Sequence, residues 1–327
     1  MVFFINIRNY LPIKQFLKYT KLMSKSQKDF QSRLMNGSLK FLEGVMRIMP
    51  RWLIGLFIGG VFPIVYLNIK GLKQICVKNL QLAYGSSKDK KEYELLTKRY
   101  IKSIGDAMMD LLYYVERPCQ LSKVTQIENE DHLKRSLELG RGVIAVTAHM
   151  GNFPLMFVSL VQKGYKVNVV IRSMRDENFS KFVFYLCAKF GINMIQTSPG
   201  KQFLKESLGA LKRNEILFFL LDEMVAEKNG VKVRFLNRDV VRAKGPILFL
   251  ERTSSPILPM FIVQDEKRHF KIFIEKPFEI IRAGSDDENM VKNIAGLTNV
   301  IEHYVKQYPF QWGGWFNKRW ALGVNAG

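Results

Sequence analysis

The amino-acid sequence predicts an α/β protein with a mostly parallel central sheet flanked by helices. Short apolar runs bounded by turn residues alternate along the chain with longer stretches of helical periodicity, and this alternation is typical of β-α-β units. Polar or charged residues directly follow three of the apolar runs, as expected where ligands bind at the carboxyl edge of an open sheet. The length of 327 residues allows one large core or two smaller ones.

The composition narrows the class of protein. Hydrophobic residues make up 47% of the chain and charged residues 24%, which is typical of a globular protein and not of a disordered one. The three cysteines, Cys76, Cys119 and Cys187, lie far apart, which argues against a disulfide framework or a zinc site and indicates a reducing compartment. Because no Gly-rich nucleotide loop or metal-binding pattern occurs, we expect neither a cofactor nor a metal.

The net charge of +21 predicts a polyanionic partner, which can be nucleic acid, an anionic membrane surface, or an acidic protein or substrate. Nucleic acid is the least favoured of these, because only the charge supports it and the chain carries no recognised binding motif.

Residues 1–69 combine many cations with a long uncharged segment. The first 51 residues carry ten Lys or Arg but only Asp29 and Glu43, mixed with large apolar residues, which favours a helix on an anionic bilayer surface. As a straight helix, Trp52–Ile69 would span roughly 27 Å, slightly less than the hydrocarbon core of a bilayer. Pro63 predicts a kink or a break in this helix. We expect a membrane-associating segment that is shallow, re-entrant or barely spanning, and a buried core helix is the alternative.

Two helices are expected between residues 71 and 117, because apolar residues recur there at three- and four-residue spacings. The residues Tyr84 to Ser87 separate them, and Ser86 or Ser87 is the expected cap of the second helix.

The next part of the chain predicts the sheet. Apolar runs end at His149, at Arg172 and at the pair Asp222-Glu223. Because the carboxyl ends of parallel strands share one edge, we expect these residues to converge. The remaining elements expected here are a strand at 191–196 and helices at 155–163, 176–190 and 201–213.

A basic stretch marks the second half. After a strand at 231–236 and a turn at 237–239, Arg242 and Lys244 precede a helix at 247–252. Cations beside a helix N-terminus predict a phosphate site, and a solvated turn is the alternative. The remaining elements expected here are an edge hairpin from 257–263 and 270–274, and a last helix at 288–308.

Several short blocks occur in a characteristic order between about residue 50 and the end. They are Arg51-Trp52-Leu53, Lys78-Asn79-Leu80 with Leu82-Ala83, Ala148-His149-Met150-Gly151-Asn152-Phe153, Arg172, Asp222, Gly245-Pro246, and the closing Pro309-Phe310-Gln311-Trp312 with Trp315 and Arg319-Trp320. Together they resemble the bacterial lipid A biosynthesis acyltransferases of the lauroyl and myristoyl type, within the group of lysophospholipid and glycerolipid acyltransferases.

The resemblance implies a glycerolipid-acyltransferase-like fold and an enzyme at the cytoplasmic face of the bacterial inner membrane. Such an enzyme moves a fatty acyl chain from a thioester of acyl carrier protein or coenzyme A to a hydroxyl of a lipid A-type or other phosphorylated lipid. Its partners are then the acyl donor, the phosphorylated acceptor and anionic membrane lipid. The domain division that follows is a membrane-associating segment at 1–69 and an acyltransferase domain at 70–327.

The resemblance also assigns roles to residues. His149 would take the proton of the acceptor hydroxyl, and a carboxylate would normally orient its imidazole. The family has that carboxylate five residues after the histidine, where this chain has Pro154. Asp222 and Glu223 are the candidates to replace it, and Glu223 is the freer of the two because Asp222 matches the family's own acidic position.

The resemblance also implies protein groups that bind the two substrates. The amides around Gly151 and Asn152 would donate to the thioester oxygen. Phosphates of the acceptor would bind Arg172, Arg242 and Lys244. A second departure is the closing block, which carries an extra glycine and has Asn317 in place of histidine.

Two other functions stay open. A catalytically weak relative retained for lipid or partner binding is the first, because of Pro154. A nucleic-acid-binding protein is the second, supported by charge alone.

Overall fold

The computed structural model describes residues 44, 48–85, 89–172, 183–184, 187–317 and 320, and the statements below concern these residues. They fall into two compact units. The helical unit comprises the described residues up to Pro118 and those after Trp312, and the sheet unit comprises Cys119–Trp312. The division predicted at residue 69 concerned membrane association and stays a prediction.

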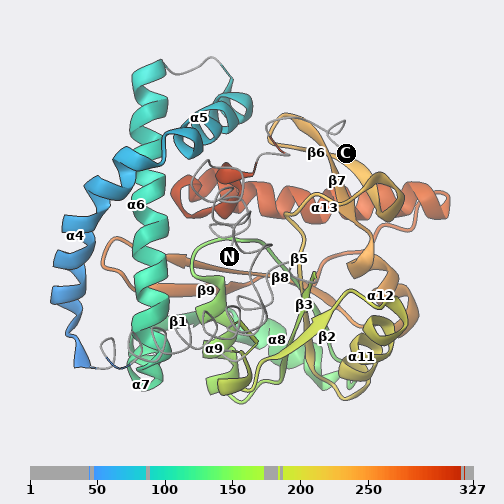
Figure 1. Cartoon of the computed structure of the whole chain (residues 1–327). Coiled ribbons are helices and arrows are strands. Elements are labelled where there is room, and N and C mark those ends of the chain that lie inside the picture. Colours follow the sequence, from blue (N-terminus) through green and yellow to red (C-terminus); the bar gives the residue numbers. More distant parts are fainter. Residues whose placement is uncertain are drawn as a thin grey trace, which may run out of the picture. The chain divides into compact units, whose positions relative to one another are not determined.

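The helical unit consists of three long helices and a short 3-10 helix. In it, α4 and α5 each pack against α6, and α5 also contacts η4 (Figure 1). The bounds are α4 (Arg51–Asn68), α5 (Lys70–Tyr84), α6 (Lys90–Val115) and η4 (Gly313–Phe316).

The break between α5 and α6 lies where the sequence predicted it. Gly85, with φ of 72°, follows the last residue of α5. The cap of α6 is a different residue from the expected serines: Asp89 accepts from the Glu92 amide at 2.8 Å, and the Glu92 carboxylate accepts from the Asp89 amide at 3.0 Å. This reciprocal capping box satisfies two donors that a helix start otherwise leaves unpaired.

Helix α4 is continuous through Pro63, so the proline does not break it. Arg51 at its start is paired with Asp110 of α6 at 3.3 Å and lies over the Tyr114 ring at 5.3 Å. Large apolar side chains of α4 are 63–67% exposed, and these are Trp52, Leu56, Ile64 and Leu67. Within the described part of the chain, none of the helices has the length and apolarity needed to cross a membrane.

The Lys78-Asn79-Leu80 block anchors the closing segment of the chain. The buried Asn79 amide donates to the carbonyls of Trp315 at 2.9 Å and Asn317 at 3.0 Å. The Tyr100 hydroxyl donates to the Gly313 carbonyl at 3.1 Å, and its ring contacts Phe316 at 4.9 Å. A motif without evident chemistry in the sequence therefore has a structural role.

The sheet unit is built on a seven-stranded sheet in the order β1-β9-β8-β2-β5-β3-β4. All neighbouring pairs are parallel except β8 and β9, so the predicted α/β class with a mostly parallel sheet is confirmed. The strands are β1 (Thr125–Glu128), β2 (Val143–Thr147), β3 (Val167–Ile171), β4 (Asn193–Gln196), β5 (Ile216–Leu220), β8 (Ile257–Gln264) and β9 (Phe270–Ile274).

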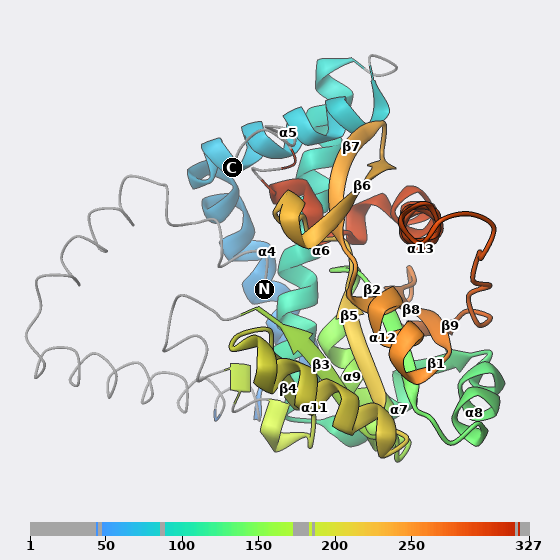
Figure 2. The same ribbon diagram turned by 90° about the vertical axis from the view of Figure 1, so that its right-hand side faces the viewer.

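Helices cover both faces of this sheet. Helices α11 and α12 contact each other over one face, and α9 lies on the opposite face (Figure 2). Right-handed crossovers explain this: the chain moves outward from β2 through α9 to β3, and returns from β4 through α11 to β5. The helices are α7 (Pro118–Val124), α8 (Glu130–Glu138), α9 (Phe153–Gln162), α11 (Gly200–Lys212), α12 (Gly245–Thr253) and α13 (Asp286–Gln307).

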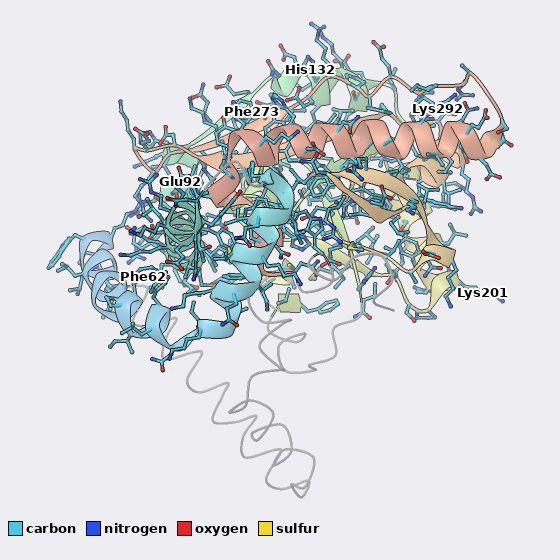
Figure 3. All side chains as sticks on the ribbon, turned by 90° about the horizontal axis from the view of Figure 1, so that it is seen from above. Phe62, Glu92, His132, Lys201, Phe273 and Lys292 are labelled. Atoms are coloured by element: carbon cyan, nitrogen blue, oxygen red, sulfur yellow. The ribbon has the colours of Figure 1, made fainter. Side chains whose placement is uncertain are left out.

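The long helix α13 packs against strands β8 and β9. Its Tyr304 stacks on Phe261 of β8 at 4.1 Å and contacts Phe273 of β9 at 5.9 Å. Figure 3 shows α13 lengthwise, with its Lys292 labelled and the label of Phe273, a residue of β9, near its other end.

The structure corrects three local expectations. The hairpin of β8 and β9 is not at the edge, because the unpredicted β1 pairs with β9 there. The turn expected at 237–239 is centred on Leu236-Asn237, between β6 (Gly230–Phe235) and β7 (Arg238–Ala243), which pair as a hairpin. Arg242, expected beside the start of the next helix, belongs to β7, while the helix expected at 247–252 is confirmed as α12. The helix expected at 176–190 falls largely outside the described residues.

Candidate active site

The predicted convergence of strand ends brings His149 and Asp222 into contact. Strands β2 and β5 are parallel neighbours with Thr147 opposite Leu220, so His149 and Asp222, each two residues further on, lie level. The imidazole Nδ1 of His149 lies 2.9 Å from Oδ1 of Asp222, and the His149 amide donates to Oδ2 at 3.1 Å. Asp222 thus supplies a carboxylate beside Nδ1, although position 154 carries a proline.

Trp312 is the third member of this group. Its indole Nε1–H donates to Oδ2 of Asp222 at 2.8 Å. All three side chains are buried. The Asp222 carboxylate therefore accepts hydrogen bonds on both oxygens, which offsets the cost of burying its charge.

The other imidazole nitrogen, Nε2, is the atom that could accept a proton from a substrate. Within the described residues, Nε2 of His149 has no hydrogen-bond partner. The nearest charged group is the Glu223 carboxylate, whose Oε1 lies 3.7 Å away on a side chain that is 35% exposed. A proton on Nδ1, held by Asp222, leaves Nε2 with a lone pair that can accept a proton.

Burial and charge act in opposite directions on this pair. Burial alone would lower the pKa of His149, but the charge and hydrogen bond of Asp222 and the charge of Glu223 outweigh it and raise the pKa. Burial alone would raise the pKa of Asp222, but the charge and hydrogen bond of His149, the Trp312 hydrogen bond and the Arg242 charge lower it. Asp222 consequently stays ionised beside the imidazole.

Arg242, for which a phosphate contact was expected, is buried beside Asp222 and not exposed. The side chain is 1% exposed, its guanidinium lies 4.5 Å above the Phe235 ring, and Nη1 donates to the Asp222 carbonyl. Burial lowers its pKa to about 10, against the opposing charges of Asp222 and Glu223. In this conformation the guanidinium is shielded from solvent and donates to the backbone at Asp222, and its predicted phosphate contact stays a prediction.

The other two predicted phosphate ligands are placed differently. Arg172 is exposed at the end of β3, and its Nη2 donates to the Met224 carbonyl at 3.1 Å. Lys244 is the residue before α12 and is partly exposed. The phosphate contacts expected of Arg172 and Lys244 stay predictions.

The turn after His149 gives Gly151 a different task from the expected one. Its φ is 53°, and a Cβ there would lie 2.2 Å from the Ile262 carbonyl oxygen. Its amide donates to the Gln311 carbonyl at 2.7 Å and so is not available to a thioester oxygen.

The start of α9 is the better-placed source of donors. Asn152 is buried and precedes the helix, and the Phe153 ring lies edge-on to the imidazole at 5.2 Å. Pro154 has no amide N–H, and the Leu155 amide donates to the Asn152 carbonyl at 2.8 Å. The Phe153 amide is therefore the candidate in this first turn to bind a developing negative charge. The role predicted for Asn152 stays a prediction.

Two site residues were missed from the sequence, namely Gln311 and Trp312. They were recognised only as part of the closing signature, because their hydrogen-bond partners lie far away in the sequence. No group of His, Cys, Asp and Glu side chains suited to a metal ion occurs in the described ranges.

The chain is similar to curated acyltransferases. The chain is 27% identical over 141 residues to the phosphatidylinositol mannoside acyltransferase of Mycobacterium tuberculosis (strain ATCC 25618 / H37Rv), which covers 43% of this chain and 44% of that protein. It is 24% identical over 142 residues to the protein of the same name from Mycolicibacterium smegmatis (strain ATCC 700084 / mc(2)155), covering 43% and 46%. The chain thus matches less than half the length of these curated relatives.

The family comparison covers far more of the chain. The model described as bacterial lipid A biosynthesis acyltransferase matches residues 39–321, which include both units and every site residue named above. The chain therefore belongs to the bacterial lipid A biosynthesis acyltransferase family.

Proposed function

We propose that this protein is an enzyme that transfers a fatty acyl chain from a thioester of acyl carrier protein or coenzyme A to a hydroxyl of a phosphorylated lipid, with a lipid A-type acceptor first among them. Family membership supports acyl transfer to a lipid. The observation that carries the mechanism is the buried His149–Asp222 pair, bonded at 2.9 Å through Nδ1 while Nε2 has no hydrogen-bond partner among the described residues.

The proposed step follows from this geometry. The acceptor hydroxyl oxygen attacks the thioester carbonyl carbon while Nε2 of His149 takes the hydroxyl proton. Asp222 stabilises the imidazolium that forms. When the C–S bond breaks, the imidazolium returns the proton to the leaving thiolate, so the products are an ester and a free thiol.

Pro154 does not argue against catalysis in this arrangement. The family pattern needs a carboxylate beside the histidine, and Asp222 is already hydrogen-bonded to Nδ1. This favours an active enzyme over a catalytically weak relative.

The acceptor and donor are inferred from charge. The net charge of +21 and the exposed Arg172 favour anionic ligands, and the named relatives are acyltransferases of a phospholipid glycoside. An acidic carrier protein would be attracted by the same excess of basic residues.

The proposed location is the cytoplasmic face of the bacterial inner membrane. The exposed apolar residues of α4 support membrane association, because such residues gain about 1.5–3 kcal/mol each when fully removed from water. Residues 1–43, with most of the leading cations, lie outside the described residues.

The test is an acyl transfer assay with purified protein, an acyl-carrier thioester or acyl-CoA, and a phosphorylated glycolipid, read by mass spectrometry of the lipid. Acylated lipid should appear with the native protein, and His149→Ala should lower kcat on the order of a hundredfold or more. A raised acceptor KM in Arg172→Ala would support its phosphate contact. Native protein that acylates no lipid acceptor would contradict the proposed function.

A further inference from the structure

We propose that Trp312 is a positioning residue for this reaction: its indole N–H fixes the Asp222 carboxylate so that Oδ1 meets the imidazole of His149. The inference rests on the proposed function and extends it to the closing Gln311-Trp312 segment, which the mechanism above does not use.

The hydrogen bonds on Asp222 define the geometry. Oδ2 accepts from the Trp312 indole at 2.8 Å and from the His149 amide at 3.1 Å, while Oδ1 faces Nδ1 at 2.9 Å. Two donors on one oxygen set the rotation of a carboxylate, so the second oxygen has one direction left. In this structure, that direction is toward Nδ1.

Trp312 is itself held by contacts on both sides. The buried indole packs edge-on against the Phe235 ring at 5.4 Å, and its backbone forms an isolated antiparallel bridge with Met150, the residue after His149. The imidazole and the indole are therefore attached to neighbouring backbone segments.

Gln311 fixes the register of this segment. Its side chain accepts from the Gln264 amide at 2.8 Å and donates to the Gln264 carbonyl at 2.7 Å, as a paired strand would. Its own carbonyl accepts from Gly151 at 2.7 Å. The segment thus joins the end of β8 to the turn that carries His149, and the indole position depends on backbone pairing as well as on packing.

The indole also affects the titration of the pair. Burial raises the pKa of Asp222, and the Trp312 hydrogen bond is one of the interactions that lower it. Without that bond Asp222 would be more basic and would hold the imidazolium more strongly, so the pKa of His149 would rise. Because the base must be neutral, the acid limb of the pH–kcat profile would move to higher pH.

The experiment compares Trp312→Phe with the matched variant Trp315→Phe. Phenylalanine keeps a large ring and removes the N–H; Trp315 is equally buried but packs against Tyr84 and Trp320. In the acyl transfer assay, Trp312→Phe should lower kcat about tenfold or more, the effect expected for a bond to a charged group. It should leave both KM values unchanged and move the acid limb to higher pH, whereas Trp315→Phe should not move the limb.

A second measurement does not need the Trp312 variant. The chain has four tryptophans, so its indole N–H signals can be followed by NMR. One of them should shift with pH as His149 titrates, and this shift should disappear in His149→Ala. That result would support the link between Trp312 and the pair even if Trp312→Phe failed to fold.

The outcomes separate the two proposals. Native kcat and an unmoved acid limb in a folded Trp312→Phe would overturn the positioning role, as would indole signals that ignore the titration of His149. Loss of the acyltransferase proposal would look different, because the native protein would then acylate no lipid while the indole signal still followed His149.

Discussion

At the residue scale, Glu223 lies beside the imidazole nitrogen of His149 that we propose as the base. Its carboxylate lies 3.7 Å from Nε2, the atom that would take the proton. Burial lowers the pKa of His149, while Asp222 and then Glu223 raise it, so each carboxylate stabilises the protonated imidazole. A negative charge beside Nε2 therefore raises the pH at which the imidazole becomes neutral.

Glu223→Gln should move the acid limb of the pH–kcat profile to lower pH. The substitution removes a negative charge beside Nε2, so the pKa of His149 falls and the imidazole becomes neutral at a lower pH. The measurement is kcat against pH for the native protein and the variant. Glu227→Gln, an exposed carboxylate on η2 (Glu227–Asn229), is the control and should leave the limb in place. A limb that does not move in Glu223→Gln would mean that Glu223 does not influence the base.

The sequence predicted part of this site for physical reasons. Parallel strands place their carboxyl ends on one edge, and this alone brought His149 and Asp222 together. The role of Arg242 was not predictable, because a cation near a helix start looks the same whether it faces solvent or is buried above a ring such as Phe235. The Trp312 bond joins residues 90 positions apart and leaves no local pattern.

At the element scale, α4 combines attachment to α6 with an exposed apolar side. Arg51 ties its start to α6, while Trp52, Leu56 and Leu67 remain exposed. Exposed apolar side chains of this kind are typical of a helix that lies on a bilayer surface.

We expect a Trp52→Gln, Leu56→Gln, Leu67→Gln triple variant to bind anionic phospholipid vesicles about tenfold or more weakly. Each side chain contributes about 1.5–3 kcal/mol when fully buried, and about 1.4 kcal/mol is a factor of ten. Vesicle co-sedimentation measures the bound fraction. Leu95→Gln and Leu139→Gln change exposed leucines of α6 and of the residue after α8, and serve as controls. Equal binding by the triple variant and the controls would exclude α4 from the membrane contact.

The predicted elements were accurate where apolar runs were long. The apolar runs expected to end at His149 and at Asp222 are β2 and β5, and each strand ends two residues before that position. In contrast, β1 (TQIE) is short and polar, and charges in β7 hid its alternation, so neither strand was predicted. The Leu236-Asn237 turn also lacks glycine, although both residues have positive φ, of 46° and 62°.

At the scale of the whole molecule, the closing segment serves both units. Trp312, the last residue of the sheet unit before the chain changes units, donates to Asp222. Trp315, at the start of the return to the helical unit, accepts from Asn79 through its carbonyl. The family signature at this end of the chain therefore has a separate structural purpose in each unit.

The central claim is that His149 takes the hydroxyl proton with Asp222 as its partner. The most direct measurement is kcat for acyl transfer by the native protein, His149→Ala, Asp222→Asn and the double variant. If the two residues act as a unit, each single substitution should cost on the order of a hundredfold or more, and the double variant should be only slightly slower than the worse single one. Near-native turnover in His149→Ala, or losses that multiply in the double variant, would contradict it.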